Sequence, residues 1–398
     1  MVNKFLYSRG GCENYMLFLG EQLKKLGHEI EYFGMFDEKN TVGNSAGKYT
    51  QNMDFHSSGF ARFLYPFKIV YSFEARRKII QVIDKFKPDV IHMNNINFQL
   101  TPSVIYGAKK RGIPIVQTVH DYQMICPNHL LYDFNNNEIC EKCTKGSYLH
   151  CIKNKCIHGS RVKSIIGAIE AALYSVLKPY NKVDLFICPS YFLEKKLLTS
   201  KEFYQGKTKT IHNFIDKNKF AYKDESNESY IAFAGRLSKE KGIELLSQVA
   251  KQLPNYTFKV AGSGPDAEIL NNIENIQTLG FLSGEPLVNF VRKAKVLLIP
   301  SIWYENCPLS ILEAQCMGVP VVTINTGGMA ELVQDGITGT LANCPTADEI
   351  AQKLRETIEN EDYYRRLREN CKTGKDSILS VETYTDLLLR EYENLIAR

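Results

Sequence analysis

Short blocks of hydrophobic residues alternate with helical stretches along this chain. Residues 296–299 are an apolar run that ends at Pro300, a pattern typical of a buried parallel strand. Residues 310–317 have helical character, and Gly318 follows as a C-terminal cap. Residues 319–323 form the next apolar run. This order of strand, helix and strand predicts a parallel sheet with helices packed on it.

The same alternation extends through both halves of the chain. Strands are expected at 2–6, 28–33, 88–93, 114–119, 183–188, 230–234, 258–261 and 276–279, and helices at 12–27, 102–111, 161–177, 191–198 and 381–396. Two halves with this pattern predict an α/β protein made of two Rossmann-like domains with a cleft between them.

Two carboxylates with seven residues between them stand around the helix at 310–317. Glu305 lies in the loop after the strand, and Glu313 lies within the helix. A helix N-terminus that follows a parallel strand collects free backbone N–H groups and favours anions. A diphosphate held there would leave Glu313 near a ribose and Glu305 near sugar hydroxyls. Alternatively, Glu305 is a solvated loop residue and Glu313 a surface carboxylate.

Other candidate residues also follow expected strands. Gly10 and Gly11 form a turn before a helix, which suits a phosphate or sugar site but is also common in ordinary βα turns. Arg236 and Lys241 follow the strand at 230–234 and would reinforce an anion site, or else form a surface charge cluster. His120 ends the strand at 114–119, where open α/β sheets bind ligands, although a structural role would explain it too.

Length and charge narrow the class of protein. The chain has 398 residues, enough for two domains with full cores, and no apolar run approaches the roughly 20 residues that span a bilayer. No signal peptide is recognisable, so a cytoplasmic protein is expected. Lys and Arg number 24 against 16 Asp and Glu up to residue 190, a balance of +8, whereas the remainder carries 25 against 28.

The basic first half suits docking on the inner face of a membrane. Residues 60–78 combine many aromatic residues with Arg76, Arg77 and Lys78, as interfacial segments do. Ordinary helices with aromatic residues facing the core would give the same pattern.

An insertion at about residues 126–158 is rich in cysteine. Cys140, Cys143, Cys151 and Cys156 are candidate ligands of a structural zinc ion, but only the first pair has the usual spacing of a metal knuckle. Reduced thiols that pack together are the alternative. A catalytic metal is not expected, because no Asp-x-Asp triplet occurs.

Two longer motifs carry a family resemblance. The stretch from Glu305 reads E-N-C-P-L-S-I-L-E-A-Q-C-M-G-V-P-V-V, and residues 235–242 read G-R-L-S-K-E-K-G. With the His120-Asp121 pair, these residues resemble the retaining GT-B glycosyltransferases of family four, and the cysteine-rich insertion is similar to that of one subset. The resemblance covers nearly the whole chain.

The resemblance implies domains and site residues. It implies an acceptor-side domain at 1–212, a nucleotide-sugar-binding domain at 213–380, and a final helix at 381–398 that crosses back to the first domain. Implied catalytic residues are Glu305, His120, Arg236 and Lys241. Implied donor-binding residues are Gly10, Gly11, Arg236, Lys241, Phe281, Leu309, Ser310 and Glu313.

The resemblance also implies the function. It indicates a retaining, metal-independent hexosyltransferase that moves a sugar from a UDP- or GDP-sugar to a glycan or lipid-linked saccharide, in bacterial surface polysaccharide synthesis and without nucleic acid. A sugar-nucleotide epimerase of the same architecture, and a sugar-nucleotide-binding protein without activity, are the alternatives. The intact set of Arg236, Lys241, Glu305 and Glu313 disfavours the second.

Overall fold

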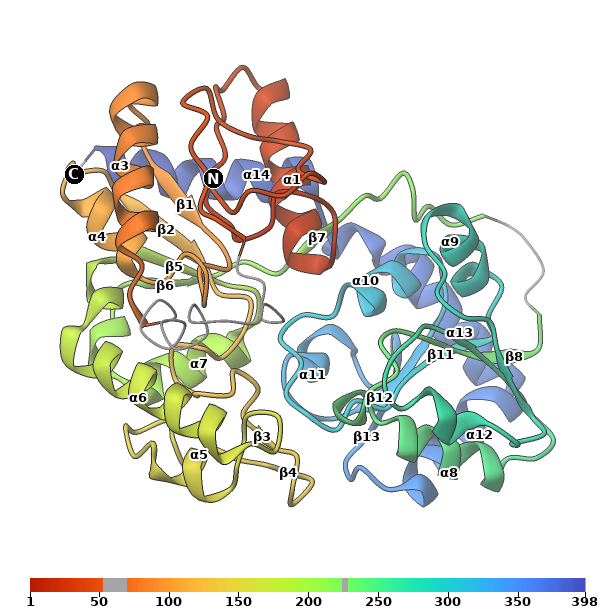
Figure 1. The fold of residues 1–398 in the computed structure, drawn as a ribbon. Coiled ribbons are helices and arrows are strands. Elements are labelled where there is room, and N and C mark those ends of the chain that lie inside the picture. The colour runs from red at the N-terminus through yellow and green to blue at the C-terminus, as the bar shows by residue number, and fades with distance from the viewer. Residues whose placement is uncertain (53–69, 224–227, 398) are drawn as a thin grey trace. The chain divides into compact units, whose positions relative to one another are not determined.

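The computed structural model describes residues 1–52, 70–223 and 228–397, which divide into two compact units (Figure 1). Unit 1 contains Met1–Leu131, Cys140–His212 and Val381–Arg398, and unit 2 contains Tyr132–Ile139 and Asn213–Ser380. The chain leaves unit 1 after His212 and returns after Ser380. The sequence did not predict that residues 132–139, within the cysteine-rich insertion, group with unit 2.

Unit 1 is built on a parallel sheet with the strand order β1-β2-β5-β6. Its strands are β1 (Ile91–Met93), β2 (Ile115–Thr118), β5 (Leu185–Cys188) and β6 (Thr208–Thr210). Its helices are α1 (Gly11–Lys25), α3 (Phe73–Phe86), α4 (Ser103–Lys109), α5 (Leu149–Lys153), α6 (Arg161–Leu177), α7 (Tyr191–Ser200) and α14 (Val381–Ile396), with 3-10 turns at Pro179–Lys182 and Glu202–Tyr204. Serine caps begin α6 and α7 because the Ser160 and Ser190 hydroxyls accept backbone N–H bonds.

The first two strands expected from the sequence are much shorter in the structure. Val2 forms parallel bridges to both Phe33 and Met93, but neither 2–6 nor 28–33 is a regular strand. The hydrophobic pattern was correct, since Val2 and Phe33 are buried. The prediction of two full strands was wrong: in the described part of the chain, pairing here is limited to single bridges at Val2, and residues 28–31 pair with no strand.

The final helix, α14, packs on α1 within unit 1 (Figure 1). Its Tyr384 hydroxyl lies 2.7 Å from the hydroxyl of Tyr15 on α1. Its Tyr392 hydroxyl hydrogen-bonds Nδ1 of His92, whose Nε2 lies 2.7 Å from Thr118 Oγ1. Burial lowers the pKa of His92 to about 3, so this network is held by neutral groups.

Unit 2 is built on a larger parallel sheet with the order β10-β9-β8-β11-β12-β13. Its strands are β8 (Tyr230–Ala234), β9 (Thr257–Ala261), β10 (Ile276–Thr278), β11 (Val296–Ile299), β12 (Val321–Ile324) and β13 (Gly339–Ala342). Its helices are α8 (Ile243–Gln252), α9 (Gly284–Arg292), α10 (Leu309–Cys316), α11 (Met329–Leu332), α12 (Ala347–Glu359) and α13 (Glu361–Gly374), with 3-10 turns at Lys239–Lys241, Ala267–Leu270 and Lys375–Ser377.

Two short strand pairs complete unit 2. A hairpin pairs β3 (Tyr132–Asp133) with β4 (Glu138–Ile139), and β7 (Phe214–Ile215) pairs in parallel with β14 (Leu379–Ser380), where the chain enters and leaves the unit. The Lys239 side chain donates a hydrogen bond to the carbonyl of Phe134 at the tip of the hairpin, at 3.1 Å.

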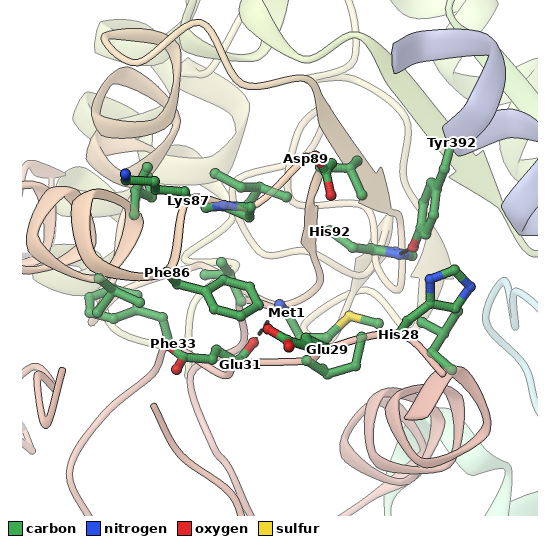
Figure 2. A pocket seen from close by; sticks show the side chains of 18 of the residues that line it. Met1, His28, Glu29, Glu31, Phe33, Phe86, Lys87, Asp89, His92 and Tyr392 are labelled. Atoms are coloured by element: carbon green, nitrogen blue, oxygen red, sulfur yellow. Dashed lines mark hydrogen bonds between the residues drawn. The ribbon is translucent and has the colours of Figure 1, made fainter. Parts of the chain in front are cut away.

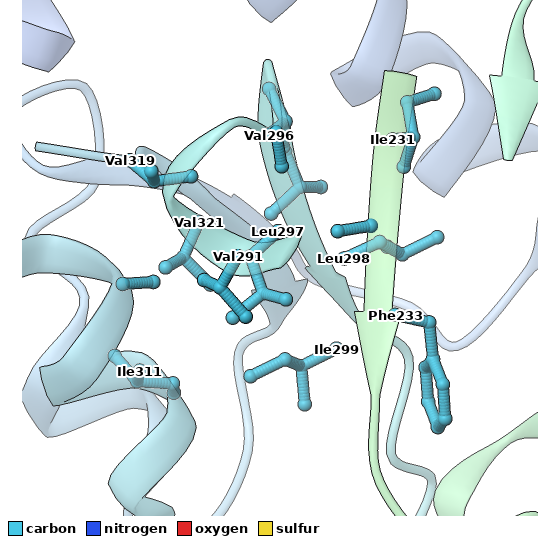
Figure 3. Close-up of a cluster of buried hydrophobic side chains, with 14 of the residues drawn as sticks. Ile231, Phe233, Val291, Val296, Leu297, Leu298, Ile299, Ile311, Val319 and Val321 are labelled. Carbon is cyan, nitrogen blue, oxygen red and sulfur yellow. The ribbon is translucent and has the colours of Figure 1, made fainter. Parts of the chain in front are cut away.

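The core of unit 2 lies between the sheet and its helices (Figure 3). All four residues of β11 are buried, together with Ile231 and Phe233 of β8 and Ile311 of α10. Burying each such side chain contributes about 1.5–3 kcal/mol. Because β11 is central and buried on both faces, the loop that follows it starts from a fixed point.

Two sequence predictions concern membranes. None of the helices in the described part of the chain is long and apolar enough to cross a bilayer. Of the aromatic and basic stretch at 60–78, residues up to 69 lie outside the described residues, and Arg76, Arg77 and Lys78 lie on α3.

Candidate functional site

The loop after β11 presents Glu305 as a buried carboxylate. The residue is 7% exposed, which contradicts a solvated loop residue. Oε1 accepts hydrogen bonds from Lys241 Nζ at 2.5 Å, from Ser301 Oγ at 2.9 Å and from Trp303 Nε1 at 2.9 Å. Charge-assisted bonds of this kind are strong, so the carboxylate and the ammonium fix each other's position. The sequence treated Glu305 and Lys241 separately, whereas the structure joins them.

Glycines set the path of the loops around this ion pair. The Gly328 N–H donates to the carbonyl of Glu305 at 2.7 Å, and a Cβ atom on Gly328 would lie only 1.6 Å from the carbonyl oxygen of Asn306. Gly242 has φ of 74°, and its Cβ would lie 1.9 Å from the carbonyl oxygen of Pro300. Both contacts are with backbone, which cannot move aside cheaply, so no other residue fits.

Arg236 follows β8 and is exposed. Within the described residues its guanidinium makes no hydrogen bond or ion pair, so this cation is available to a ligand. The nearby Gly262 and Gly264 pack on the same loop, since their Cβ atoms would lie 1.8 Å from the carbonyl of Gly235 and 2.1 Å from that of Leu237. The Gly-x-Gly pattern at 262–264 is therefore explained by loop packing.

The remaining site residues expected in unit 2 lie on α10 and in the loop that follows β10. No side chain caps the start of α10 at Pro308, and Leu309 and Ser310 are half-buried there. Burial raises the pKa of Glu313 to about 7, while the charge of Lys219 acts in the opposite direction. Phe281, after β10, is 75% exposed. Because the sheet is parallel, the loops after β8, β10 and β11 lie at its carboxyl edge.

In unit 1, His120 follows β2 at the carboxyl edge of the smaller sheet. Its Nε2 lies 2.8 Å from Asn94 Oδ1, and its ring packs edge-to-face on Tyr15 with the centroids 5.2 Å apart. Burial lowers the pKa of His120 to about 4, so the imidazole is neutral near pH 7.

Gly10 and Gly11 lie at the start of α1, where steric contacts give little reason for glycine. Gly10 is the N-cap residue with an extended backbone, and a Cβ on Gly11 would meet no atom within 4 Å. The fold does not require glycine at position 11, which leaves close approach of a ligand to the backbone as a reason for it.

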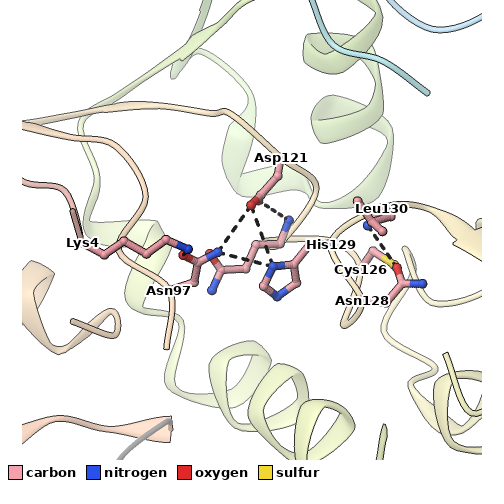
Figure 4. Close-up of polar contacts among 8 residues, drawn as sticks. Lys4, Asn97, Asp121, Cys126, Asn128, His129 and Leu130 are labelled. Atoms are coloured by element: carbon pink, nitrogen blue, oxygen red, sulfur yellow. Dashed lines mark hydrogen bonds and ion pairs between the residues drawn. The ribbon is translucent and has the colours of Figure 1, made fainter. Parts of the chain in front are cut away.

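Beside His120 lies a polar cluster that sequence reasoning missed, apart from Asp121 (Figure 4). Asn97 Nδ2 lies 3.4 Å from both Asp121 Oδ2 and His129 Nδ1, and Lys4 Nζ lies 3.4 Å from Asn97 Oδ1. Asp121 and His129 are 3.8 Å apart. The contacts span up to 93 positions in the sequence, so no local motif could have revealed them.

Two residues at this cluster have unusual backbone conformations. Phe98 and His129 have φ of 62° and 67°, and their rings stack with the centroids 5.3 Å apart. Left-handed conformations are uncommon for residues other than glycine and often mark functional sites. They make the cluster a candidate binding surface of unit 1.

The predicted zinc ligands are not assembled into a metal site. In the described ranges, no group of three or more His, Cys, Asp or Glu side chains is arranged to hold a metal ion. The Cys151 thiol instead lies 3.9 Å from the carbonyl of Ser164. Burial raises the pKa of Cys126 to about 11 and that of Cys143 to about 12, which favours protonated thiols. Structural zinc stays a prediction for elemental analysis to decide.

Sequence comparisons match both halves of the chain to glycosyltransferases. The family model described as Glycosyltransferase Family 4 matches residues 9–219, and the model described as Glycosyl transferases group 1 matches residues 214–374. An uncharacterized glycosyltransferase of Methanocaldococcus jannaschii is 30% identical over 393 residues, covering 91% of this chain and 89% of the relative. An uncharacterized 42.6 kDa protein in the cps region of Klebsiella pneumoniae is 24% identical over 343 residues, covering 82% and 84%.

Solved structures share the fold over the full length. The HepE protein of Anabaena, in complex with UDP and glucose, has a TM-score of 0.68 at 17% identity and covers 99% of this chain and 98% of its own. Sucrose-phosphate synthase of Thermosynechococcus elongatus has a TM-score of 0.70 at 16% identity, covering 100% and 98%. These similarities show the GT-B fold. From the family matches over both halves and the full-length similarity to the M. jannaschii protein, the chain belongs to the family 4 glycosyltransferases.

Proposed function

We propose that this glycosyltransferase moves a hexose, with retention of configuration, from a UDP- or GDP-sugar to a glycan or lipid-linked saccharide in surface polysaccharide synthesis. The relative from the cps region of Klebsiella and the complexes of HepE with UDP and UDP-glucose support this substrate class. The observation that carries the proposal is the ion pair between the part-buried Lys241 and the buried Glu305 in unit 2, with the exposed Arg236 in the same loop as Lys241.

The proposed diphosphate site consists of Arg236, Lys241 and the first turn of α10. When the bond between the sugar and the diphosphate breaks, negative charge grows on the leaving phosphate. Arg236, Lys241 and the N–H groups of Leu309 and Ser310 at the start of α10 would interact with this growing charge. The interaction would be stronger in the transition state than in the bound donor. Such differential stabilisation speeds the chemical step without any metal ion.

Glu305 and Glu313 take different proposed roles. Glu305 orients Lys241 through Oε1 and keeps Oε2 for sugar hydroxyls. Three donors on Oε1 make Glu305 a weak nucleophile, which favours a front-face reaction in which the leaving phosphate takes the acceptor proton. Glu313 would accept hydrogen bonds from the ribose hydroxyls. The base of the nucleotide would lie near Phe281, in the loop that follows β10.

Unit 1 holds two further candidate contacts. The neutral His120 suits a hydrogen bond to a sugar hydroxyl, since an uncharged imidazole has one donor and one acceptor nitrogen. Gly10 and Gly11 would let a sugar or phosphate approach the start of α1 closely. No step of the reaction uses zinc.

Incubation with single sugar nucleotides tests the proposal. UDP- and GDP-hexoses, with and without a lipid-linked saccharide, would be followed by mass spectrometry. Acceptor-dependent transfer with the anomeric configuration retained supports the proposal. Isomerised donor without acceptor would show an epimerase, binding without turnover would show a binding protein, and inverted product would refute retention.

We also propose that unit 1 docks on the inner face of an anionic membrane, where a lipid-linked acceptor would be held. On α3, Phe73 is 77% exposed and Arg77 is exposed one turn later, whereas Lys78 is paired with Glu74 at 2.6 Å. Flotation with anionic vesicles should fall at high salt and in Arg77→Glu, and should change little in the control Lys25→Glu. Wild-type protein that fails to float at low salt would exclude docking.

A further inference from the structure

Helix α6 in unit 1 exposes apolar side chains and buries small and polar ones. Its buried residues are Ser164, Gly167, Ala168 and Glu170. An ordinary surface helix has the opposite arrangement, with its apolar stripe turned toward the core. Apart from the basic residues in its first turn, every exposed residue of α6 is aliphatic, and we refer to these residues as the α6 stripe: Val162, Ile165, Ile169, Ala172, Leu173, Val176 and Leu177.

The α6 stripe is a continuous face of the helix. With 3.6 residues per turn, its members fall within a sector about 140° wide and extend over about 22 Å of the helix axis. Val162 and Val176, near its two ends, are 67% and 75% exposed. Soluble monomers rarely leave a large continuous apolar face open to water. A partner is therefore expected to cover this one.

The α6 stripe is an open face and not the wall of a pocket. Unit 1 has a cavity of about 460 Å³, lined by residues of α1, α3 and α14 and by Met1, Glu31 and His92 (Figure 2). None of the residues that line this cavity belongs to α6. A partner of the α6 stripe would therefore approach unit 1 from outside.

The chain around α6 is strongly basic. The acidic residue between positions 142 and 183 is Glu170, which is buried. The same stretch contains eight basic residues, all exposed, which stand before α6, in its first turn and after its end: Lys142, Lys145, Lys153, Lys155, Arg161, Lys163, Lys178 and Lys182. An apolar helix face between basic residues is typical of helices that lie in the interface of an anionic membrane. A second copy of the chain would instead bring two basic surfaces together.

The end of α6 is linked to the start of α3, where the exposed Phe73 lies. The Tyr106 hydroxyl on α4 donates to the carbonyl of Leu177 at 2.9 Å. The ring centroid of Tyr106 is 6.4 Å from that of Tyr71, which is 4.7 Å from that of Phe73. Helices α3, α4 and α6 follow one another along one side of unit 1 (Figure 1).

We propose that α6 is the element of unit 1 that enters the interface of an anionic membrane, with the α6 stripe against the acyl chains and the neighbouring basic residues on the headgroups. This inference rests on the docking of unit 1 proposed above and names the surface that makes the contact. The helix has 17 residues and would lie in the plane of the interface. In the part of the chain that the structure describes, no helix is suited to crossing the bilayer.

A tryptophan in the α6 stripe tests the contact with lipid directly. Val176→Trp is compared with Ile337→Trp, which changes an exposed residue of unit 2. The vesicles contain equal parts of phosphatidylglycerol and phosphatidylcholine with brominated acyl chains, and the signal of the wild-type protein is subtracted. The fluorescence added by Val176→Trp should fall by more than about half, because the indole would reach the acyl boundary, and that added by Ile337→Trp by less than about a tenth.

Flotation with the same vesicles at low salt measures how much the α6 stripe contributes. One variant combines Val162→Gln, Ile169→Gln and Val176→Gln, because glutamine is polar and favours a helix. The matched control makes the same change at three exposed apolar residues on other elements: Leu26, Ile269 and Ile337. The partition coefficient should fall at least about tenfold in the stripe variant and less than about twofold in the control. Equal thermal midpoints of the two variants show that both are folded.

The outcomes separate this proposal from the ones on which it rests. Wild-type flotation of the stripe variant, with no quenching in Val176→Trp, would overturn the role of α6 and leave docking through α3 standing. Wild-type protein that does not float would refute docking by either helix, whereas transfer to a water-soluble acceptor measures the glycosyltransferase activity separately. A dimer in sedimentation that the stripe variant abolishes would assign the α6 stripe to a second copy and refute the proposal.

Discussion

The two units present functional candidates that are held in different ways. In unit 2, the loops at 235–242, 300–308 and 326–328 are fixed by glycines against backbone atoms, with gaps too small for a methyl group. In unit 1, the cluster of Lys4, Asn97, Asp121 and His129 is joined by side-chain contacts of 3.4–3.8 Å. We refer to them as the glycine-held loops and the side-chain cluster.

This difference explains why one site is visible in the sequence and the other is not. Where a Cβ atom would lie only 1.6 Å or 1.9 Å from a backbone oxygen, only glycine fits. The glycine-held loops therefore require glycine at fixed positions in the sequence. Long side-chain contacts allow many substitutions and join distant positions. The glycine-held loops carry the site proposed for the nucleotide part of the donor, and the side-chain cluster is the candidate binding surface of unit 1.

The largest expected effect comes from a methyl group in the glycine-held loops. Gly328→Ala should displace the Glu305 loop, destabilise unit 2 by about 1–3 kcal/mol and lower transfer more than 100-fold. Gly11→Ala is the matched control for folding, because its Cβ would meet open space, and its thermal midpoint should stay within about 1 °C. Calorimetry and an activity assay measure both. If Gly328→Ala were as stable and active as wild type, the close contacts of the glycines would not be what fixes the glycine-held loops.

Loss of the Glu305 charge should have the next largest effect. Glu305→Gln keeps an oxygen for the Ser301 and Trp303 donors but loses the ion pair with Lys241. A charge-assisted contact is worth about 1.5–3 kcal/mol, so transfer should fall about 10–100-fold while the protein stays folded. In the double variant with Lys241→Met, the two losses should not add, because each removes the same pair. Additive losses would show that the two residues act separately.

The same comparison shows what the sequence can predict. Strands β8 and β11 and helices α6 and α14 begin and end at the expected residues, because each is a continuous apolar or amphipathic block between clear breakers. The lengths of the strands expected at 2–6 and 28–33 were overestimated. A strand needs a neighbouring strand to pair with, and the local hydrophobic pattern does not show whether one is present. The Lys241–Glu305 pair and the side-chain cluster depend on tertiary proximity across 64 and up to 93 positions.

A change of pH should have a smaller effect on the affinity for the nucleotide. The pKa of Glu313 is about 7 without ligand, and ribose hydroxyls that donate to its carboxylate should lower it. Nucleotide binding then releases a proton, so affinity should rise from pH 6 to pH 8 by up to about tenfold for a pKa drop of one to two units. Calorimetric titration of UDP or GDP into wild type and Glu313→Gln measures this. A variant that keeps the full pH dependence would exclude Glu313 as its source.

The smallest effect is expected in the side-chain cluster. Asn97→Ala removes contacts of 3.4 Å, each weak by itself, so the apparent KM for the acceptor should rise less than about threefold with kcat unchanged. Steady-state kinetics with varied acceptor would show this. A loss of more than 100-fold in kcat would mean that the cluster takes part in the chemical step.

The central claim is that Arg236 and Lys241 hold the donor diphosphate. Calorimetric titration of UDP and GDP into Arg236→Ala, Lys241→Ala and the control Lys239→Ala tests it most directly. Lys239 lies in the same turn, but its ammonium is bonded to the Phe134 carbonyl, so Lys239→Ala should bind like wild type. Arg236→Ala and Lys241→Ala should each bind the preferred nucleotide about 10–100-fold more weakly. Wild-type affinity in both, with the fold intact, would contradict the account.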